Sequence, residues 1–227
     1  MKKLFLLFCI LSSASLAFAM EQPESTINCH CFKKRTFDPQ NKYAADGYLL
    51  TTSFNSFIAR NFTISKRQIV MMLMRGSVGP EDMLIGLYLA READVDLKSL
   101  LAILDNGGTW EQIISQVSLQ KTGESKDFLQ SLKTVISDKK VAVEIITDQL
   151  LKEFFGKTHP AMEKLRVGGA NGRELTLIYL LEKFGNRNKS AADILAMKTK
   201  EKKSWGEIAL FFGLSPKGTG KLLSKVQ

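Results

Sequence analysis

Three side chains that bind metals or form disulfides stand together as Cys29-His30-Cys31. Thiolate and imidazole are ligands for soft metals, but structural zinc normally has four protein ligands and this triplet offers three. The alternatives are a small disulfide ring between Cys29 and Cys31, which contributes little through loop entropy, or a bridge to another chain. The C-x-x-C-H spacing of a haem attachment site is absent. The sequence favours a disulfide, with a metal site as the alternative, and predicts no cofactor.

Lysine is the second candidate for binding chemistry. Ten basic and three acidic residues lie between Lys183 and Gln227, whereas residues 20–182 hold 20 of each. A like-charged end is usually a solvated face, but it can attract an anionic lipid, a polysaccharide or a nucleic acid. The candidate anion-binding residues are Lys198, Lys200, Lys202, Lys203, Lys217 and Lys221.

Catalytic motifs are missing from the sequence. It contains neither H-E-x-x-H nor G-x-S-x-G. Residues 215–222 look in passing like a phosphate-binding loop, but Ser215 replaces the first glycine and Leu222 replaces the hydroxyl that would bind magnesium. The paired acids Glu81-Asp82 fall at an expected helix start, where the helix dipole favours them. The sequence therefore predicts a protein without enzymatic activity.

The two tryptophans occupy related segments, at 109–119 and 204–214. In both, a hydroxyl residue precedes tryptophan, isoleucine follows three residues after it, and leucine follows nine after it. This pattern predicts a duplication. Because large aromatic side chains dominate the burial of a core, Trp110 and Trp205 are expected to be structural joints between helices rather than site residues.

The elements that carry these residues are expected to be short amphipathic helices. Apolar residues recur at three- and four-residue spacing, and Ser65 and Thr109 each begin a capping-box sequence. Glycine turns separate the helices, and no segment alternates with period two for long enough to form a strand. We predict an all-α fold, a tandem duplication of a short-helix bundle unit built as stacked helical hairpins. Its expected divisions are a signal peptide at 1–19, an extended cysteine-containing leader at 20–46, a first copy at 47–120, a connecting helix at 121–143 and a second copy at 144–227.

Two resemblances follow from the second tryptophan segment. The Ser-Trp-Gly-Glu-Ile-Ala unit resembles repeats in uncharacterised exported bacterial proteins, which implies export and a helical fold but no activity. Residues 204–223 also resemble the helix-turn-helix of DNA-binding proteins, through the spacing of Ala209 and Gly213. That resemblance implies base contacts near Lys217, Thr219 and Lys221. The glycines at 218 and 220 depart from the pattern, because glycine weakens a helix.

The N-terminus predicts export. Residues 1–19 combine two lysines, an apolar run from Leu4 to Leu11 and the small residues Ala17 and Ala19 of a signal-peptidase site. No later segment approaches the roughly 20 apolar residues that a membrane span needs. We therefore expect a periplasmic or secreted protein, cleaved near Ala19, that binds or supports an unidentified protein or envelope component. The alternative is a binder of an anionic partner through the basic end, with nucleic acid disfavoured by export.

Overall fold

The computed structural model describes residue 32, residues 34–76 and residues 78–225. The predicted signal peptide and the Cys29-His30-Cys31 triplet lie outside these residues. The described part contains twelve α-helices, two short 3-10 helices and no β-strand. The predicted all-α fold of stacked helical hairpins is confirmed. None of the helices in the described part is long and apolar enough to cross a bilayer.

The helices fall into two series of six. The first unit comprises α2 (Asp46–Asn61), α3 (Lys66–Met74), α4 (Pro80–Ala93), α5 (Leu97–Asp105), α6 (Trp110–Leu119) and α7 (Gly123–Val135). The second unit comprises α8 (Lys139–Phe155), α9 (His159–Val167), α10 (Gly172–Phe184), α11 (Ala191–Thr199), α12 (Trp205–Phe211) and α13 (Pro216–Thr219). A 3-10 helix, η1 (Pro39–Asn41), precedes the first unit, and η2 (Leu222–Lys225) follows the second.

The first four helices of the two units have similar lengths in the same order, and the last two are shorter in the second unit. They are 16, 9, 14, 9, 10 and 13 residues in the first unit, and 17, 9, 13, 9, 7 and 4 residues in the second. The segment predicted as one connecting helix at 121–143 instead holds all of α7 and the start of α8. The chain breaks at Asp138, whose side chain accepts hydrogen bonds from the backbone amides of Lys140 and Val141 and so starts α8.

Side-chain caps fix where several of the short helices begin. The two predicted capping boxes, at Ser65 and Thr109, are confirmed. In each, the hydroxyl accepts from a backbone amide of the first turn, and a glutamine three residues later reaches back to the amide of the capping residue. Such caps satisfy amides that have no partner inside the helix. Helices of nine or ten residues are marginal alone, so packing must hold them in place.

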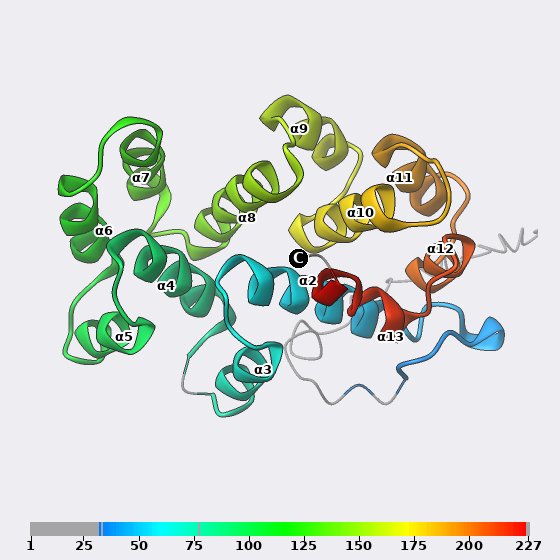
Figure 1. Ribbon diagram of the computed structural model, residues 1–227, viewed down its shortest axis with the longest axis horizontal. Helices are drawn as coiled ribbons and strands as arrows, with labels where there is room; N and C mark the ends of the chain where they lie inside the picture. Colours follow the sequence, from blue (N-terminus) through cyan, green and yellow to red (C-terminus); the bar gives the residue numbers. More distant parts are fainter. Residues whose placement is uncertain (1–31, 33, 77, 226–227) are drawn as a thin grey trace, which may run out of the picture.

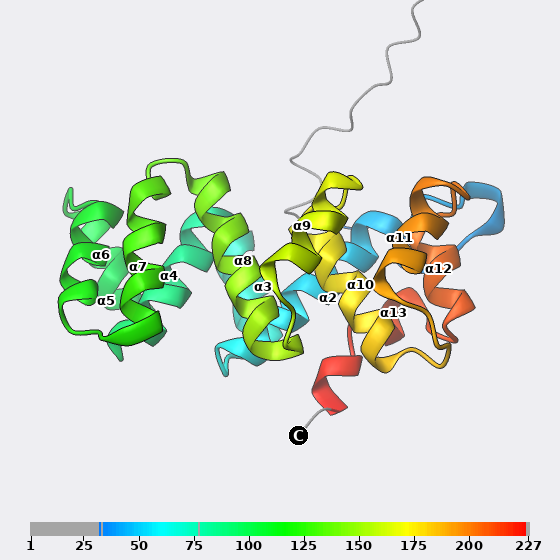
Figure 2. The ribbon, with the colours of Figure 1, turned by 90° about the horizontal axis from the view of Figure 1, so that it is seen from above.

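Four long helices, the first and third of each unit, form the centre of the molecule (Figures 1 and 2). Helix α4 packs against α8, α8 packs against α10, and α10 packs against α2. The first long helix of each unit thus packs on the second long helix of the other. Helices α5 to α7 lie at one end of an elongated body, and α11 to α13 lie at the other. The two units consequently share one core.

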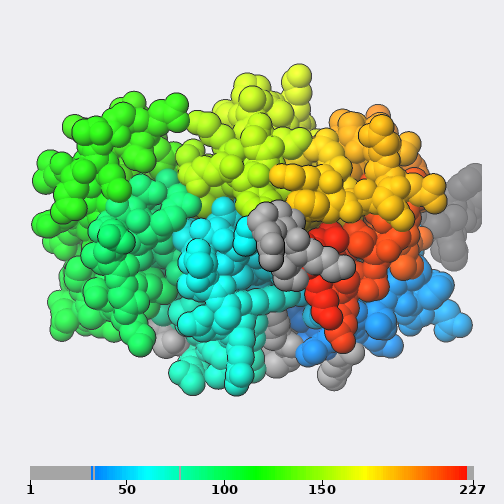
Figure 3. Space-filling model, viewed as in Figure 1, coloured from blue at the N-terminus to red at the C-terminus, as the bar shows by residue number. Residues whose placement is uncertain are grey.

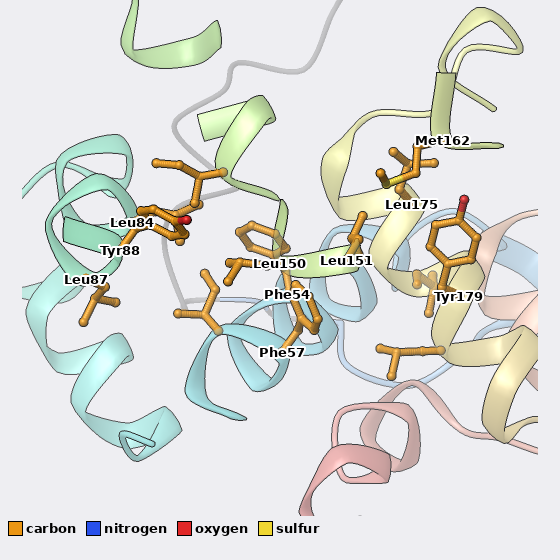
Figure 4. Close-up of a cluster of buried hydrophobic side chains, with 14 of the residues drawn as sticks. Phe54, Phe57, Leu84, Leu87, Tyr88, Leu150, Leu151, Met162, Leu175 and Tyr179 are labelled. Atoms are coloured by element: carbon orange, nitrogen blue, oxygen red, sulfur yellow. The ribbon is translucent and has the colours of Figure 1, made fainter. Parts of the chain in front are cut away.

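The shared core is aromatic where the units meet. Phe57 of α2 stacks on Phe155 of α8 with ring centroids 5.9 Å apart, and Phe155 lies 5.9 Å from Tyr179 of α10. Figure 4 shows Phe57 and Tyr179 in a cluster of buried side chains with leucines from α4, α8 and α10. Phe57 and Tyr179 are at most 1% exposed. Phe155 is partly buried and packs against the core, so these three rings join the two units.

The described part of the leader is folded onto the second unit, which corrects the expectation of an extended segment. Asp38 caps η1, and Ala45 is buried. Lys42 Nζ and Tyr43 Oη donate hydrogen bonds to the carbonyl of Lys202, at 3.1 and 2.9 Å. The ring of Phe37 lies against Gly206, where a Cβ atom would come within 2.8 Å of it. Residues 34–45 thus cover the start of α12.

Candidate anion-binding site

The tryptophans make the same contact in both units. Trp110 Nε1 donates to Asp82 Oδ1 at 2.7 Å, and Trp205 Nε1 donates to Glu174 Oε1 at 3.0 Å. Each acid is the third residue of its unit's second long helix, α4 or α10. Both tryptophans are nearly inaccessible, at 4% and 1% exposure. These contacts support the predicted structural role, in which each indole fixes α6 or α12 to the start of a long helix.

Two of the six predicted anion-binding lysines, Lys198 and Lys203, are paired with carboxylates. Lys198 Nζ lies 3.4 Å from Asp46 Oδ2 and 5.7 Å from the ring centroid of Trp205, in a half-buried position. Burial raises the pKa of Asp46, although the backbone amides of Trp205 and Gly206 and the ammonium of Lys198 oppose that shift. Lys203 pairs with Glu201 at 2.7 Å. Both lysines thus already have a carboxylate partner, and anion binding by the six lysines stays a prediction.

Lys200 and Lys202 lie near the turn between α11 and α12. Lys200 is the exposed residue that directly follows α11. Lys202 has a left-handed backbone, with φ of 55°, and its carbonyl accepts the two hydrogen bonds from the leader. The backbone of Lys202 thus has a structural role that its charge did not suggest.

Lys217 and Lys221 instead line a cavity at the contact between α13 and α2, which lie on one face of the molecule in Figure 3. The cavity, called here the Lys66 cavity, has a volume of about 510 Å³. Its lining comes from α2, the start of α3, α13 and the residues after α13. The lining residues are Tyr48, Thr52, Ser56, Ala59, Arg60, Ile64, Lys66, Lys217, Gly220, Lys221 and Leu223. Four of them are cationic, and none of the described lining residues is acidic.

Local sequence explains how distant segments form this cavity. The capping box at Ser65 starts α3 and makes Lys66 its first residue. Ser215 Oγ accepts from the amide of Gly218 at 3.0 Å and so starts α13. Ser56 Oγ of α2 lies 2.6 Å from the carbonyl oxygen of Gly220 and donates to it. That bond ties the end of α13 to the middle of α2.

Gly220 is needed where the two segments approach. Its φ of −65° is open to any residue. A Cβ atom there would nevertheless lie 2.8 Å from Thr52 Oγ1 and 3.2 Å from Lys66 Nζ. Glycine therefore leaves open the space in front of the Lys66 ammonium.

Lys66 is the most perturbed basic group in the cavity. Its Nζ donates to Thr52 Oγ1, and burial lowers the pKa of Lys66 to about 8. Within the described part of the chain, Arg60, Lys66 and Lys217 have no ion pair. Desolvation without an opposite charge disfavours an ammonium ion. An anion bound in the cavity would favour the ammonium ion and so offset the cost of its desolvation.

Sequence reasoning identified two of the four cationic residues, Lys217 and Lys221, and missed Arg60 and Lys66. Arg60 lies in the last turn of an apolar helix, and Lys66 falls within a capping sequence. Only the packing of α13 on α2 brings the two pairs together. The signal available in the sequence was a lysine without a nearby acid, which is too common to be informative.

A second cavity, of about 320 Å³, lies where α2, α4, α8 and α10 meet. Phe54 and Ile58 of α2 line it together with charged residues of both signs, which are Glu81, Lys140, Glu144 and Arg173. Burial lowers the pKa of Arg173, and the charge of Glu81 opposes this. Arg173 also donates to Thr51 Oγ1 at 3.4 Å. This mixture of charges favours no single class of ligand, so the Lys66 cavity is the better candidate.

The remaining predictions concern the cysteine triplet and the helix-turn-helix. The cysteine triplet lies outside the described residues, and the described residues hold no group of three or more His, Cys, Asp or Glu side chains placed to bind a metal ion. The helix that would carry base contacts in a helix-turn-helix is α13, which has four residues. No known protein family, curated protein or solved structure matches this chain.

Proposed function

We propose that this is an exported, non-enzymatic binding protein whose ligand carries a negatively charged group that occupies the Lys66 cavity. One observation carries the proposal. Four cationic side chains line a cavity to which the described residues contribute no acidic side chain, and one of them, Lys66, is desolvated by burial and has a hydroxyl as its hydrogen-bond partner in the described part of the chain. Export rests on the sequence of residues 1–19.

The physical reason lies in the cost of burying charge. Removing an ammonium ion from water is unfavourable unless an opposite charge or hydrogen bonds replace the lost hydration. An anion in the cavity supplies both to Lys66. Exposed lysines such as Lys200 gain far less from an anion, because water and salt screen them. The cavity should therefore bind anions more tightly than the rest of the basic surface.

The residues that line the cavity also indicate what kind of ligand would fit it. Besides the four cations, Tyr48 offers a phenolic hydroxyl, and Ala59, Ile64 and Leu223 offer apolar surface. A small compound with an anionic group and an apolar portion would satisfy both kinds of lining. We propose such a compound from the cell envelope or its surroundings, rather than a long polyanion.

The proposal also gives a role to the duplicated architecture. Helix α2 begins the first unit and α13 ends the second, and the cavity forms where they touch. We propose that the two units arose by duplication and that the site exists only when both are packed together. The matching helix order and the two tryptophan contacts support this origin.

Calorimetric titration with sulfate at constant ionic strength tests the proposed function. We expect the purified protein to bind sulfate and the Lys217→Gln variant to lose most of that affinity. Lys200→Gln is the matched control, because it removes an exposed lysine of the same C-terminal region without touching the cavity. Equal losses in both variants, or no sulfate binding by the unmodified protein at low ionic strength, would contradict a cavity site.

A further inference from the structure

Lys66 combines three properties that are rarely found in a structural lysine. It lines a cavity rather than the surface, its Nζ is held by the nearly buried hydroxyl of Thr52, and it has no carboxylate partner among the described residues. An ordinary half-buried lysine of this protein, Lys198, pairs with Asp46 instead. The setting of Lys66 keeps an amine near an open space instead of neutralising it.

We propose that Lys66 is a reactive amine that forms a reversible imine with a small anionic aldehyde or ketone bound in the cavity. This inference rests on the proposed function, because the anionic group of the ligand must be held by the other cationic residues. In the reaction, the Nζ lone pair attacks the carbonyl carbon and gives a carbinolamine. Loss of one water molecule, made from the carbonyl oxygen and two protons, then leaves the C=N bond. Hydrolysis reverses the sequence, and no oxidant or reductant is needed.

The arrangement of charges supports this chemistry. Arg60 and Lys217 line the same cavity as Lys66 and carry charge without any ion pair in the described structure. They can hold the anionic group while the carbonyl faces Lys66. Lysines become nucleophilic when they are desolvated or placed beside other cations. Burial meets the first condition at Lys66, where it lowers the pKa of the side chain.

The acid–base state of Lys66 makes the free amine available near neutral pH. With a pKa of about 8, roughly a quarter of the Lys66 side chains are uncharged at pH 7.5, against about one in a thousand for an ordinary lysine. The same residue can thus contribute charge as an ammonium ion or condense as an amine. Adduct formation should therefore increase from pH 7 to pH 8.5, while the affinity for a simple anion falls.

The size of the site limits the partner to a small molecule. The volume of about 510 Å³ is bounded by the backbone of Gly220, which passes directly beside Thr52 and Lys66. The hydrogen bond from Ser56 holds the backbone of Gly220 in this position. The cavity accordingly fits a carbonyl compound with one phosphate or carboxylate group.

Labelling with pyridoxal 5′-phosphate at low molar ratio, followed by borohydride trapping and peptide mapping, tests this inference. We expect Lys66 to be the main labelled residue, exceeding the exposed Lys200 by at least about tenfold, a margin that allows for the lower intrinsic nucleophilicity of a less basic group. Excess sulfate should suppress the label, and pyridoxal, which lacks the phosphate, should lose the preference for Lys66.

Lys66→Arg separates this inference from the proposed function, because arginine keeps the charge but cannot form the imine. We expect this variant to bind sulfate and to lose the adduct. Sulfate binding by the unmodified protein with labelling spread evenly over its lysines would overturn the reactive amine and leave the anion site standing. Absence of sulfate binding would overturn the anion site itself.

Discussion

The pH dependence of anion binding follows directly from the position of Lys66. Burial lowers the pKa of Lys66 to about 8, so about nine tenths of its side chains are charged at pH 7 and about one tenth at pH 9. If the anion binds only when Lys66 is charged, its association constant falls about tenfold between these pH values, or about 1.4 kcal/mol. Any binding to the uncharged form makes the fall smaller.

Sulfate is the suitable probe because its charge does not change across this range. Titration calorimetry at pH 7, 8 and 9 gives the affinity directly. Repeating the pH 8 titration in two buffers of different ionisation enthalpy gives the proton uptake, expected to be about half a proton per sulfate since half of the Lys66 side chains are uncharged there. Bound sulfate favours the ammonium form and draws the missing proton from the buffer.

Lys66→Arg provides the control, because its guanidinium stays charged throughout. This variant should bind sulfate with an affinity that does not fall by the tenfold factor between pH 7 and pH 9, and without the Lys66 proton uptake. An unmodified protein whose affinity and proton uptake match those of Lys66→Arg at every pH would refute the argument that Lys66 faces the bound anion.

Three further outcomes test other parts of the structure. Gly220→Ala should weaken sulfate binding, because its Cβ would lie 2.8 Å from Thr52 Oγ1. Gly218→Ala should retain sulfate binding, because among the described residues its Cβ would meet only Ser215 Oγ, at 3.0 Å. Equal affinities in the two variants would exclude the space beside Gly220 from the sulfate site. Trp205→Phe should lower the free energy of unfolding in urea by about 1–3 kcal/mol, because a half-buried carboxylate loses its hydrogen bond. Trp110→Phe should cost less, since Asp82 keeps an ion pair with Lys139 at 2.8 Å, and the reverse order would contradict the structural role assigned to the indoles. Finally, the pKa of Lys66 is about 8 in the folded chain, against 10.5 for an ordinary lysine. Between these two pH values the unfolded chain binds more protons at residue 66 than the folded chain does, so the contribution of Lys66 to stability rises with pH. Lys66→Met should remove this rise, and an identical pH profile in both proteins would show that Lys66 is not desolvated.

Local signals predicted the helices well. The capping boxes at Ser65 and Thr109 are interactions within four residues, so the sequence alone determines them. The helices of the two tryptophan segments could also be predicted, because the spacing of their large apolar residues reflects which face of a short helix is buried. Even so, the indole partners Asp82 and Glu174 lie 28 and 31 positions away and were not anticipated.

The candidate site is formed by contacts between distant segments, which no local sequence pattern predicts. Lys198 appeared to be part of a free basic patch, but it pairs with Asp46, 152 positions away. Arg60 and Lys66 gave no signal, because their importance comes only from the approach of α13 to α2. The leader was predicted to be extended because the contacts of its described part are with Lys202 and Gly206, far along the chain, and not with its own neighbours. Charge counts locate basic segments, but tertiary packing decides which cations keep no counterion.

Locating a bound anion in a crystal is the most direct test of the central claim. Selenate has the shape and charge of sulfate, and its selenium atom can be identified by anomalous scattering. We predict one selenate ion in the Lys66 cavity, within hydrogen-bonding distance of Lys66 and of Arg60 or Lys217. Selenate found only beside exposed lysines such as Lys200, with an empty Lys66 cavity at saturating concentration, would contradict the account.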